Sequence, residues 1–106
     1  MIDVIYIFKY EGEKYNNAFK RLACSIRSLR NQGVNIIIIN NSQQKLEIID
    51  STIPITCIHK PCQGRLLNKS RSINFGVKNC VQSEYFLMSD VDIIYGSQHI
   101  KNMLKV

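Results

Sequence analysis

Asn35-Ile-Ile-Ile-Ile39 (NIIII), in the first half of the chain, ends in a continuous apolar run of four β-branched residues. Such uniform runs are typical of parallel strands that are covered by helices on both faces of a sheet. The polar, turn-forming segment Asn40-Asn-Ser42 follows directly and ends the strand. The stretch therefore predicts a buried strand of an α/β protein, and it guides the assignment of the segments on either side.

The segment before this strand predicts a helix. Asn16 or Asn17 can cap its start, and Gly33 supplies a stop at its end. Between them, apolar residues recur at helical spacing, at Ala18, Leu22, Ile26 and Leu29. Further upstream, the β-branched and aromatic residues 4–8 predict a buried strand, and the charged residues 9–13 predict a loop.

The rest of the chain continues the alternation of strands and helices. The expected elements are a short helix within residues 43–50, a strand over 53–58, a loop over 59–64, a helix over 66–81, a strand over 84–88 and a short helix over 96–106. Pro54 places its strand at a sheet edge or marks the start of the strand. The whole order predicts an α/β fold, a Rossmann-like three-layer sandwich with a mostly parallel sheet of about four strands.

The composition is that of one small globular domain. The chain has 106 residues, of which 45% are hydrophobic and 21% charged, and its net charge is +6. This charge suits an anionic partner such as a nucleotide phosphate, a nucleic acid or an acidic membrane surface. The first residues lack the pattern of a secretory signal, and no segment approaches the length of a membrane span. We therefore expect a cytoplasmic protein, with peripheral membrane contact as a further option.

The four cysteines do not form a familiar metal-binding pattern. Cys24, Cys57, Cys62 and Cys80 include no C-x-x-C pair, so a zinc site has little support. Cys57 and Cys62 flank His59, which leaves a metal site as the alternative to reduced cysteines in a cytosolic fold.

Two acids interrupt an apolar run in Phe86-Leu-Met-Ser-Asp-Val-Asp-Ile-Ile-Tyr95 (FLMSDVDIIY). Ligands of parallel α/β sheets bind beyond the carboxyl ends of the strands, and Asp90 and Asp92 follow the last expected strand. Residues i and i+2 of an extended chain point to the same side, so both carboxylates can converge on one point. A divalent cation, Mn²⁺ or Mg²⁺, relieves their repulsion and completes its shell with substrate phosphates. Alternatively, both acids are solvated turn residues or cap the next helix.

A second polar feature opens the helix expected over residues 66–81. Lys69 and Arg71 lie at its start, where backbone N–H groups also attract anions. The alternative is a basic, solvated helix face. Gly76, later in the same helix, can simply allow the helix to pack closely on the sheet.

Together these segments resemble the donor-binding half of glycosyltransferases with the GT-A fold. Leu67-Asn-Lys-Ser-Arg-Ser-Ile-Asn-Phe-Gly-Val77 and Met88-Ser-Asp-Val-Asp-Ile-Ile94 are similar to segments of family 2 enzymes and of the β-1,4-galactosyltransferase group. The second segment is the more specific. The resemblance covers nearly the whole chain, and it implies that residues 1–106 form a single nucleotide-sugar-binding domain, a truncated one that corresponds to the N-terminal half of a GT-A fold.

The resemblance implies a role for each matching residue. Asp92, the last acid of the D-x-D motif, would bind Mn²⁺ or Mg²⁺ directly, and Asp90 would contact the donor ribose or the water shell of the metal. Lys69 would face the uracil or the diphosphate, and Tyr10 would lie beside the uracil. The nucleotide-binding residues expected in all are Tyr10, Asn40, Asn41, Lys69, Arg71 and Asp90.

Two departures from the family pattern affect the expected site. Family 2 enzymes usually carry acids after the second strand, whereas this chain has Asn40, Asn41 and Ser42 there. An amide can still form a hydrogen bond to a base edge. The catalytic base of the family comes from the second half of its domain, so we assign no catalytic residue. His99 follows the D-x-D motif too closely to replace the later histidine of the family.

The function that the resemblance implies is a metal-dependent glycosyltransferase, with a UDP-hexose as donor and a glycan as acceptor. The alternatives are a non-catalytic nucleotide-binding fragment, a binding module completed by a partner chain, and a small basic protein that binds nucleic acid. No basic stripe interleaved with aromatic residues supports the last. Half a domain would also expose Ile93, Ile94 and Tyr95, so we expect self-association through apolar surface.

Overall fold

A four-stranded parallel sheet forms the centre of the structure, a computed structural model that describes residues 2–47, 49, 52–61, 69–79, 83 and 85–104. The strands are β1 (Ile2–Phe8), β2 (Val34–Asn40), β3 (Ile55–His59) and β4 (Tyr85–Ser89). Their order in the sheet is β3-β2-β1-β4, and every neighbouring pair is parallel. The predicted α/β class is confirmed.

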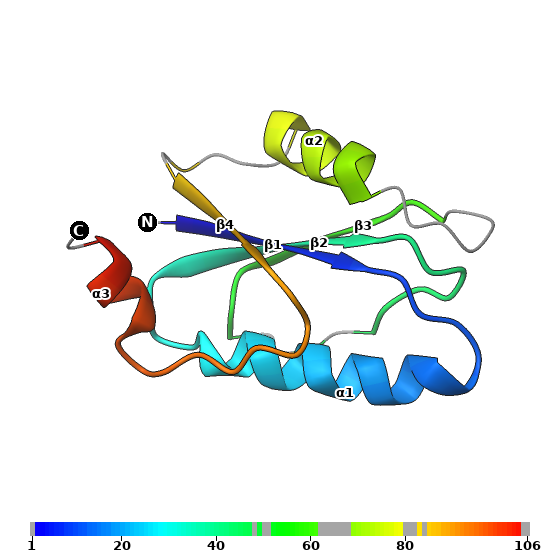
Figure 1. The fold of residues 1–106 in the computed structure, drawn as a ribbon, viewed down its shortest axis with the longest axis horizontal. Helices are drawn as coiled ribbons and strands as arrows, with labels where there is room; N and C mark the ends of the chain where they lie inside the picture. Colours follow the sequence, from blue (N-terminus) through cyan, green and yellow to red (C-terminus); the bar gives the residue numbers. More distant parts are fainter. Residues whose placement is uncertain are drawn as a thin grey trace.

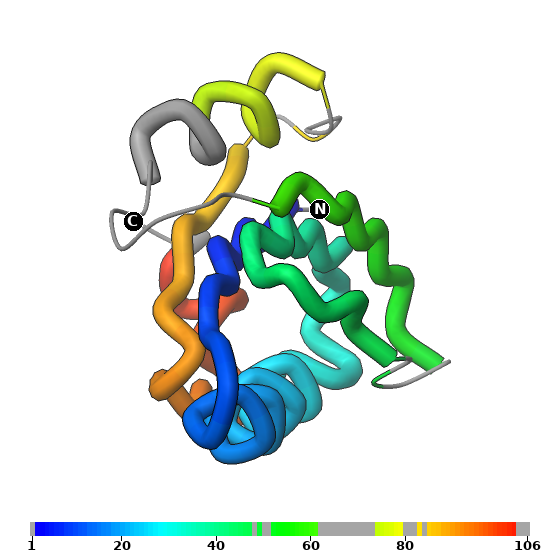
Figure 2. Tube along the Cα trace, turned by 90° about the vertical axis from the view of Figure 1, so that its right-hand side faces the viewer, coloured from blue at the N-terminus to red at the C-terminus, as the bar shows by residue number. Residues whose placement is uncertain are grey.

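The described residues also form three helices, α1 (Glu13–Ser28), α2 (Lys69–Asn79) and α3 (His99–Leu104). The helix α1 covers one face of the sheet and α2 covers the other, which gives the expected three layers (Figures 1 and 2). All four strands run in the same direction, so they start at one end of the molecule and have their carboxyl ends at the other. The short helix α3 lies at the end where the strands start, opposite their carboxyl ends (Figure 1).

The uniform apolar strands are explained by two cores, one on each face of the sheet. Alternate residues of β1 and β2 pack toward α1, and these are Val4, Tyr6, Phe8, Ile36 and Ile38. The intervening Ile5, Ile37 and Ile39 form the second core, against which Phe75 and Val77 of α2 pack. Each fully buried side chain of this size stabilises the fold by about 1.5–3 kcal/mol, so both faces fix the register of the strands.

The start of α1 differs from the sequence prediction. The helix begins at Glu13, directly after Gly12, which adopts a φ of 60°. Asn16 and Asn17 therefore lie inside the helix, and the prediction that one of them caps it is wrong. The physical reason is that glycine enters the left-handed region without strain, so the chain can turn into the helix earlier than an asparagine cap would place it.

The end of α1 also differs. The helix ends at Ser28, before the predicted stop at Gly33. Asn31 and Gly33 both adopt positive φ values, 64° and 69°, in the turn that leads into β2. Asparagine is one of the few other residues that tolerate this conformation.

The short helix predicted within residues 43–50 is wrong over its described part, because residues 43–47 and 49 form no helix. Two side chains of α1 instead donate hydrogen bonds to backbone carbonyl groups of this segment. The Tyr15 hydroxyl donates to the carbonyl oxygen of Lys45 at 3.2 Å, and Arg27 donates to that of Ile49 at 3.2 Å. Contacts with α1 thus replace the hydrogen bonds that a helix would have formed.

The segments around β3 and α3 follow the prediction more closely. The strand β3 lies at an edge of the sheet, as Pro54 indicated, and the Pro54 carbonyl accepts a hydrogen bond from Ile36 N–H at 2.9 Å. The helix α3 lies within the predicted range 96–106. Among the described residues, no helix is both long and apolar enough to cross a membrane.

The expected exposure of residues 93–95 is correct for two residues and wrong for the third. Ile93 and Ile94 are 40% and 64% exposed. Tyr95 instead belongs to the core beneath the sheet, since the chain turns back along α1 after β4. Its backbone N–H donates to the Ser28 hydroxyl at 2.9 Å, which fixes this returning segment against α1.

Candidate functional site

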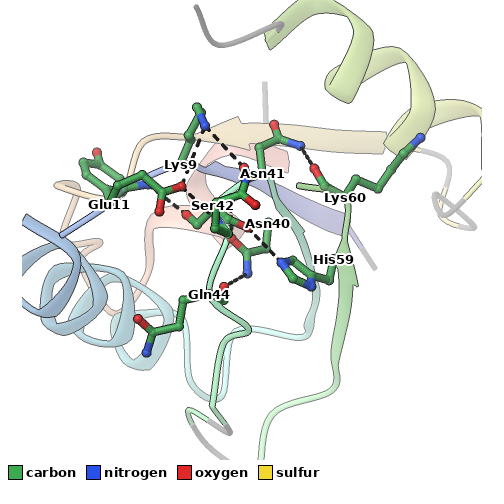
Figure 3. A network of polar contacts seen from close by, with 10 residues as sticks. Lys9, Glu11, Asn40, Asn41, Ser42, Gln44, His59 and Lys60 are labelled. Atoms are coloured by element: carbon green, nitrogen blue, oxygen red, sulfur yellow. Dashed lines mark hydrogen bonds and ion pairs between the residues drawn. The ribbon is translucent and has the colours of Figure 1, made fainter. Parts of the chain in front are cut away.

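The carboxyl ends of β1, β2 and β3 meet in a network of polar contacts (Figure 3). The network joins the loop after β1, the turn after β2 and the end of β3. Its labelled members are Lys9, Glu11, Asn40, Asn41, Ser42, Gln44, His59 and Lys60. This is the edge of the sheet at which the sequence predicts ligand binding.

Asn40, the last residue of β2, holds the turn that follows it. Its side-chain nitrogen donates to the Gln44 carbonyl at 2.8 Å, and its side-chain oxygen accepts from Ser42 N–H at 3.0 Å. The residue is fully buried. Both the oxygen and the nitrogen of the Asn40 amide therefore bind backbone groups of the turn that follows it. Asparagine is common in turns because its side chain can bind nearby backbone groups in this way.

Asn41 connects the end of β2 to both neighbouring strands. Its backbone N–H donates to the Phe8 carbonyl at 2.7 Å, and its side chain donates to the Lys60 carbonyl at 2.8 Å. The backbone of Lys60 in turn donates to the Asn40 carbonyl at 2.8 Å. The two asparagines thus continue the sheet by one step beyond its strands, across β1, β2 and β3.

Ser42 completes the same corner with two longer-range contacts. Its hydroxyl accepts from Tyr10 N–H at 2.8 Å, which fixes the loop after β1. Its carbonyl lies 2.8 Å from Nε2 of His59, so this ring nitrogen carries the proton and donates. Ser42 and His59 were not among the expected site residues, although their place at strand ends is the signal that locates them.

A charged pair borders the network on the side of β1. Lys9 donates to the Asn41 carbonyl at 3.5 Å and lies 3.8 Å from the Glu11 carboxylate. Glu11 also accepts from Gln43 N–H at 2.8 Å. The loop after β1 and the turn after β2 are therefore joined by side chains as well as by backbone.

Tyr10 lies half-buried at the same edge, on an aromatic cluster that fixes its ring. Its ring centroid is 4.9 Å from that of Phe8, which in turn meets Tyr15 edge-on at 5.7 Å. Burial raises the pKa of the Tyr15 hydroxyl, and the nearby charge of Glu47 adds to this rise. The protonated hydroxyl donates to the Lys45 carbonyl.

The amino end of α2 points toward the carboxyl ends of the strands (Figure 1). Lys69 and Arg71 lie in its first turn, and the structure describes only their backbone. Lys60 places its ammonium group 3.8 Å from the centre of the Phe75 ring, a cation–π contact that ties the end of β3 to α2. Asn74, next to Phe75, is exposed.

The two acids of the D-x-D motif lie in a turn rather than on an extended strand. β4 ends at Ser89, and Ile93 N–H approaches the Asp90 carbonyl at 3.4 Å. The premise that both carboxylates point to one side as residues i and i+2 of an extended chain is therefore wrong, because a turn begins where β4 ends. The burial pattern shows that Asp90 and Asp92 are exposed, while Val91 between them is 5% exposed and packs in the core.

Hydrogen bonds of two hydroxyl groups hold the acidic turn, the segment that contains Asp90 and Asp92. The Tyr95 hydroxyl donates to Ser89 Oγ at 2.6 Å, and Ser89 donates to the Asp90 carbonyl at 3.1 Å. Together with the buried Val91, these contacts hold the turn in place from both of its ends. The acids therefore project from a fixed backbone.

Arg21 of α1 links the acidic turn to the loop after β1. Its Nε lies 2.7 Å from Oδ1 of Asp92, and the centre of its guanidinium group lies 5.9 Å from the Tyr10 ring centroid. Both charged side chains are partly exposed, 47% and 69%. The structure thus brings together two expected site residues, Tyr10 and Asp92, through a third that sequence patterns did not indicate.

The donor set of the acidic turn fits a hard divalent cation in part. In the described part of the chain, no three or more His, Cys, Asp or Glu side chains form a group that could hold a metal. Mg²⁺ and Mn²⁺, however, are commonly held by one or two carboxylates together with substrate phosphates and water. Asp90 and Asp92 are two exposed carboxylates of the chemical type that such an ion binds.

Two clefts lie away from the acidic turn. One of about 470 Å³ is lined by residues such as Leu29, Val34 and Pro54, and one of about 460 Å³ by residues such as Asn31, Gln98 and Lys101. Both are at the amino end of the sheet, beside the start of β2. The first has several apolar residues in its walls and the second mainly polar ones, but no carboxylate of the described residues lines either, so the acidic turn remains the better candidate for metal-dependent chemistry.

His99 and the cysteines contribute little to the candidate site. His99 begins α3, at the end of the sheet opposite the strand ends, with its ring against Tyr95 at 4.9 Å. Cys24 and Cys57 are free thiols, and Cys62 and Cys80 lie outside the described residues. The Cys57–His59–Cys62 metal site therefore gains no support from the described part.

Comparisons with known proteins agree with the resemblance at the family level. The model of the family described as Glycosyl transferase family 2 matches residues 15–106. No curated protein and no solved structure gives a match. The matched segment contains α1 from Tyr15 onward, Asn40 and Asn41, α2 and the acidic turn, while Tyr10 precedes it. The expected likeness to the β-1,4-galactosyltransferase group is not confirmed by these comparisons.

Proposed function

Because the chain belongs to glycosyl transferase family 2, we propose that it binds a nucleotide-diphosphate sugar at the carboxyl edge of its sheet, for metal-dependent transfer of the sugar to a glycan acceptor. We propose a UDP-hexose as the donor. The observation that carries this proposal is the acidic turn, in which the exposed acids Asp90 and Asp92, the latter paired with Arg21, lie on a backbone fixed by Val91, Ser89 and Tyr95.

Each acid has a separate proposed role. Asp92 is the direct ligand of Mn²⁺ or Mg²⁺, and Asp90 contacts the donor ribose or a water molecule on the metal. When bound, the metal neutralises the diphosphate as it leaves. The contribution of the chain is to hold both carboxylates at the end of a buried parallel strand, where ligands of such sheets bind.

The neighbouring strand ends supply the proposed nucleotide subsite. Tyr10 offers the half-buried ring against which a base can pack, and Lys69 and Arg71 open a helix whose amino end faces this edge. The amide groups of Asn40 and Asn41 already bind backbone atoms. Both residues therefore contribute to the same subsite indirectly, by holding the turn after β2. Their role is therefore to place the turn and Tyr10.

A second candidate is a binding module completed by another chain. The exposed apolar side chains of β4 and of the segment after it support this alternative, and they are Tyr85, Phe86, Met88, Ile93 and Ile94. β4 is also an edge strand of the sheet. Such a surface favours association, including self-association of two copies of this chain.

Calorimetry with UDP in the presence and absence of Mn²⁺ tests the proposal. We expect UDP binding that depends on Mn²⁺ and that Asp92→Ala weakens by about tenfold or more, which corresponds to a loss of at least 1.4 kcal/mol. Glu47→Ala, which removes an exposed acid elsewhere, serves as the control. Unchanged binding of Mn²⁺ and UDP by Asp92→Ala would remove the metal assignment.

Two further measurements separate the candidates. Hydrolysis or transfer from a UDP-hexose distinguishes an enzyme from a binding module, since the module binds without turnover. Binding to DNA or RNA that weakens steeply with salt and ignores Mn²⁺ would instead favour the nucleic-acid alternative.

A further inference from the structure

Arg21 forms an ion pair with Asp92, the carboxylate that the proposed function assigns to the metal. Its guanidinium lies 2.7 Å from Asp92 on one side and 5.9 Å from the Tyr10 ring centre on the other. Asp92 follows β4, Tyr10 follows β1, and Arg21 comes from the middle of α1. One cation therefore spans the two strand ends between which the proposed donor would bind.

The position of the acidic turn does not depend on Arg21. Val91 is buried in the core, Tyr95 donates to Ser89, and its backbone donates to Ser28 of α1. These contacts fix the segment along α1 on both sides of Asp92. A change of Arg21 can therefore alter the charge at the site while the backbone of the turn stays in place.

We propose that Arg21 is the internal counter-ion of Asp92 in the metal-free protein, that a divalent cation displaces it, and that the displaced guanidinium then pairs with the anionic diphosphate. This inference rests on the proposed function. It assigns Arg21 two successive partners, the carboxylate of Asp92 and the phosphate oxygens of the donor. Arginine suits both, because its planar donors match carboxylate and phosphate oxygens alike.

The charges at the site explain why the exchange would couple metal and nucleotide. The guanidinium cancels one of the two carboxylate charges of Asp90 and Asp92, so a divalent cation alone meets only a weakly attractive site. A cation that arrives with a diphosphate brings negative charge for the displaced arginine. Binding of each ligand then favours binding of the other, and this linkage is reciprocal.

The Tyr10 ring gives the displaced arginine a place to stay. A guanidinium can remain on an aromatic face while its donors turn toward a new anion. Its N–H groups lie in the plane of the guanidinium itself, and the cation–π contact does not use them. The half-buried ring packs on Phe8, and Ser42 holds the backbone N–H of Tyr10, so the ring does not have to move. Arg21 would thus shift its hydrogen bonds with little change in position.

Mn²⁺ binding without nucleotide tests the first half of the inference. The electron paramagnetic resonance signal of free Mn²⁺ is titrated with the parent, Arg21→Gln, Lys20→Gln and Asp92→Asn. Lys20→Gln is the matched control, because it removes one exposed positive charge from the adjacent position of α1. We expect Arg21→Gln to bind Mn²⁺ about two- to fivefold more tightly than the parent, the range set by an exposed ion pair.

UDP provides the second readout. The ratio of Mn²⁺ affinities with and without UDP measures the coupling, and we expect Arg21→Gln to lower this ratio while Lys20→Gln leaves it unchanged. Arg21→Lys keeps the charge but loses the planar donors, so its Mn²⁺ affinity without UDP should remain near that of the parent. Equal melting temperatures of all variants in the absence of metal check that the fold is intact.

Separate outcomes identify separate failures. Equal effects of Arg21→Gln and Lys20→Gln, or no Mn²⁺ binding by Arg21→Gln, overturn the inference about Arg21. If Asp92→Asn binds Mn²⁺ and UDP as well as the parent does, the proposed function fails instead. Loss of binding in Asp92→Asn without a gain in Arg21→Gln would leave the proposed function supported and reject only the counter-ion exchange.

Discussion

The carboxylate of Asp3 accepts hydrogen bonds from both the backbone N–H and the hydroxyl group of Ser83, 80 positions later in the chain, at 3.0 and 3.1 Å. The side chain of Asn35 adds a third donor at 3.2 Å. Asp3 is 2% exposed and lies near the start of β1. These contacts join the first two strands to the residues that precede β4, at the amino end of the sheet.

Removal of this carboxylate should destabilise the protein without touching the candidate site. Asp3→Ala leaves three partly buried donors, on Asn35 and Ser83, without their acceptor, and a fully buried group in this state costs about 1–3 kcal/mol. We expect the free energy of unfolding in urea to fall by about 2 kcal/mol or more. Glu47→Ala, an exposed acid, should change it by less than about 0.5 kcal/mol. Equal effects of the two changes would show that the Asp3 contacts carry no stability.

Gly76→Ala should stabilise the protein. A methyl group at this position of α2 would lie 3.7 Å from side-chain atoms of both Ile5 and Ile39, which is ordinary van der Waals distance. A glycine within a helix costs about 0.5–1 kcal/mol relative to alanine, so the midpoint of urea unfolding should rise accordingly.

Gly12→Ala is the matched control for this change. Gly12 has open space around it, but its φ of 60° strains any residue with a Cβ, so we expect a loss of stability there. A loss at Gly76 similar to that at Gly12 would mean that α2 needs glycine for a reason other than backbone conformation.

Asn40→Asp should destabilise the turn after β2. The carboxylate can still accept from Ser42 N–H, but it cannot donate to the Gln44 carbonyl, and it places a buried negative charge beside that oxygen. We expect a loss of about 1–3 kcal/mol in urea unfolding, together with weaker UDP binding. Asn17→Asp, on the exposed side of α1, is the control, and comparable losses at both positions would contradict the role of Asn40.

Alkaline pH should weaken the fold in part through Tyr6. Burial raises the pKa of its hydroxyl above 10.0, although its hydrogen bond to Ser25 at 2.7 Å opposes this rise. The folded protein therefore keeps the Tyr6 proton to a higher pH than the unfolded chain does. The stability that this group contributes is complete below about pH 10 and is lost as the pH rises toward its folded pKa.

Urea unfolding of the parent and of Tyr6→Phe at pH 8 and pH 10.5 measures this dependence. We expect the free energy of unfolding to fall less steeply with pH in Tyr6→Phe, which has no proton to lose at this position. Parallel decreases in the two proteins would assign the alkaline transition to other groups.

The exposed apolar side chains of β4 should drive self-association. Light scattering of the parent should show a species larger than a monomer, and Met88→Glu should shift it toward the monomer, because a charge on an edge strand opposes pairing of edges. Met103→Glu in α3, where the side chain is 38% exposed, is the matched control and should have no such effect. A parent that stays monomeric at high concentration would contradict the expectation.

The strands were predictable from the sequence because their signal is local. Residues 36–39 form an apolar run that is typical of a doubly covered parallel strand, and Pro54 indicated a sheet edge or a strand start. The start of α1 was not predictable in this way. Asn16 and Asn17 are good caps by type, but the left-handed turn at Gly12 depends on how the chain leaves β1.

The position of the candidate site residues was predictable only where they follow strand ends. Asp90, Asp92, Asn40, Asn41 and Tyr10 all lie at the carboxyl edge, because alternating strands and helices imply where that edge is. The Arg21–Asp92 pair joins α1 to a turn much later in the chain, and an exposed arginine of an amphipathic helix carries no local mark of such a partner. Tyr95 was misjudged for the same reason, since its burial depends on the return of the chain along α1.

Because β1 starts at the end of the molecule where α3 lies, both ends of the described chain are remote from the acidic turn (Figure 1). A linker or a capture tag joined to either end would anchor the protein to a sensor chip with its strand-end loops facing the liquid. Immobilised protein should therefore report metal and nucleotide binding as faithfully as protein in solution, and attachment chemistry need not be tailored to spare the site.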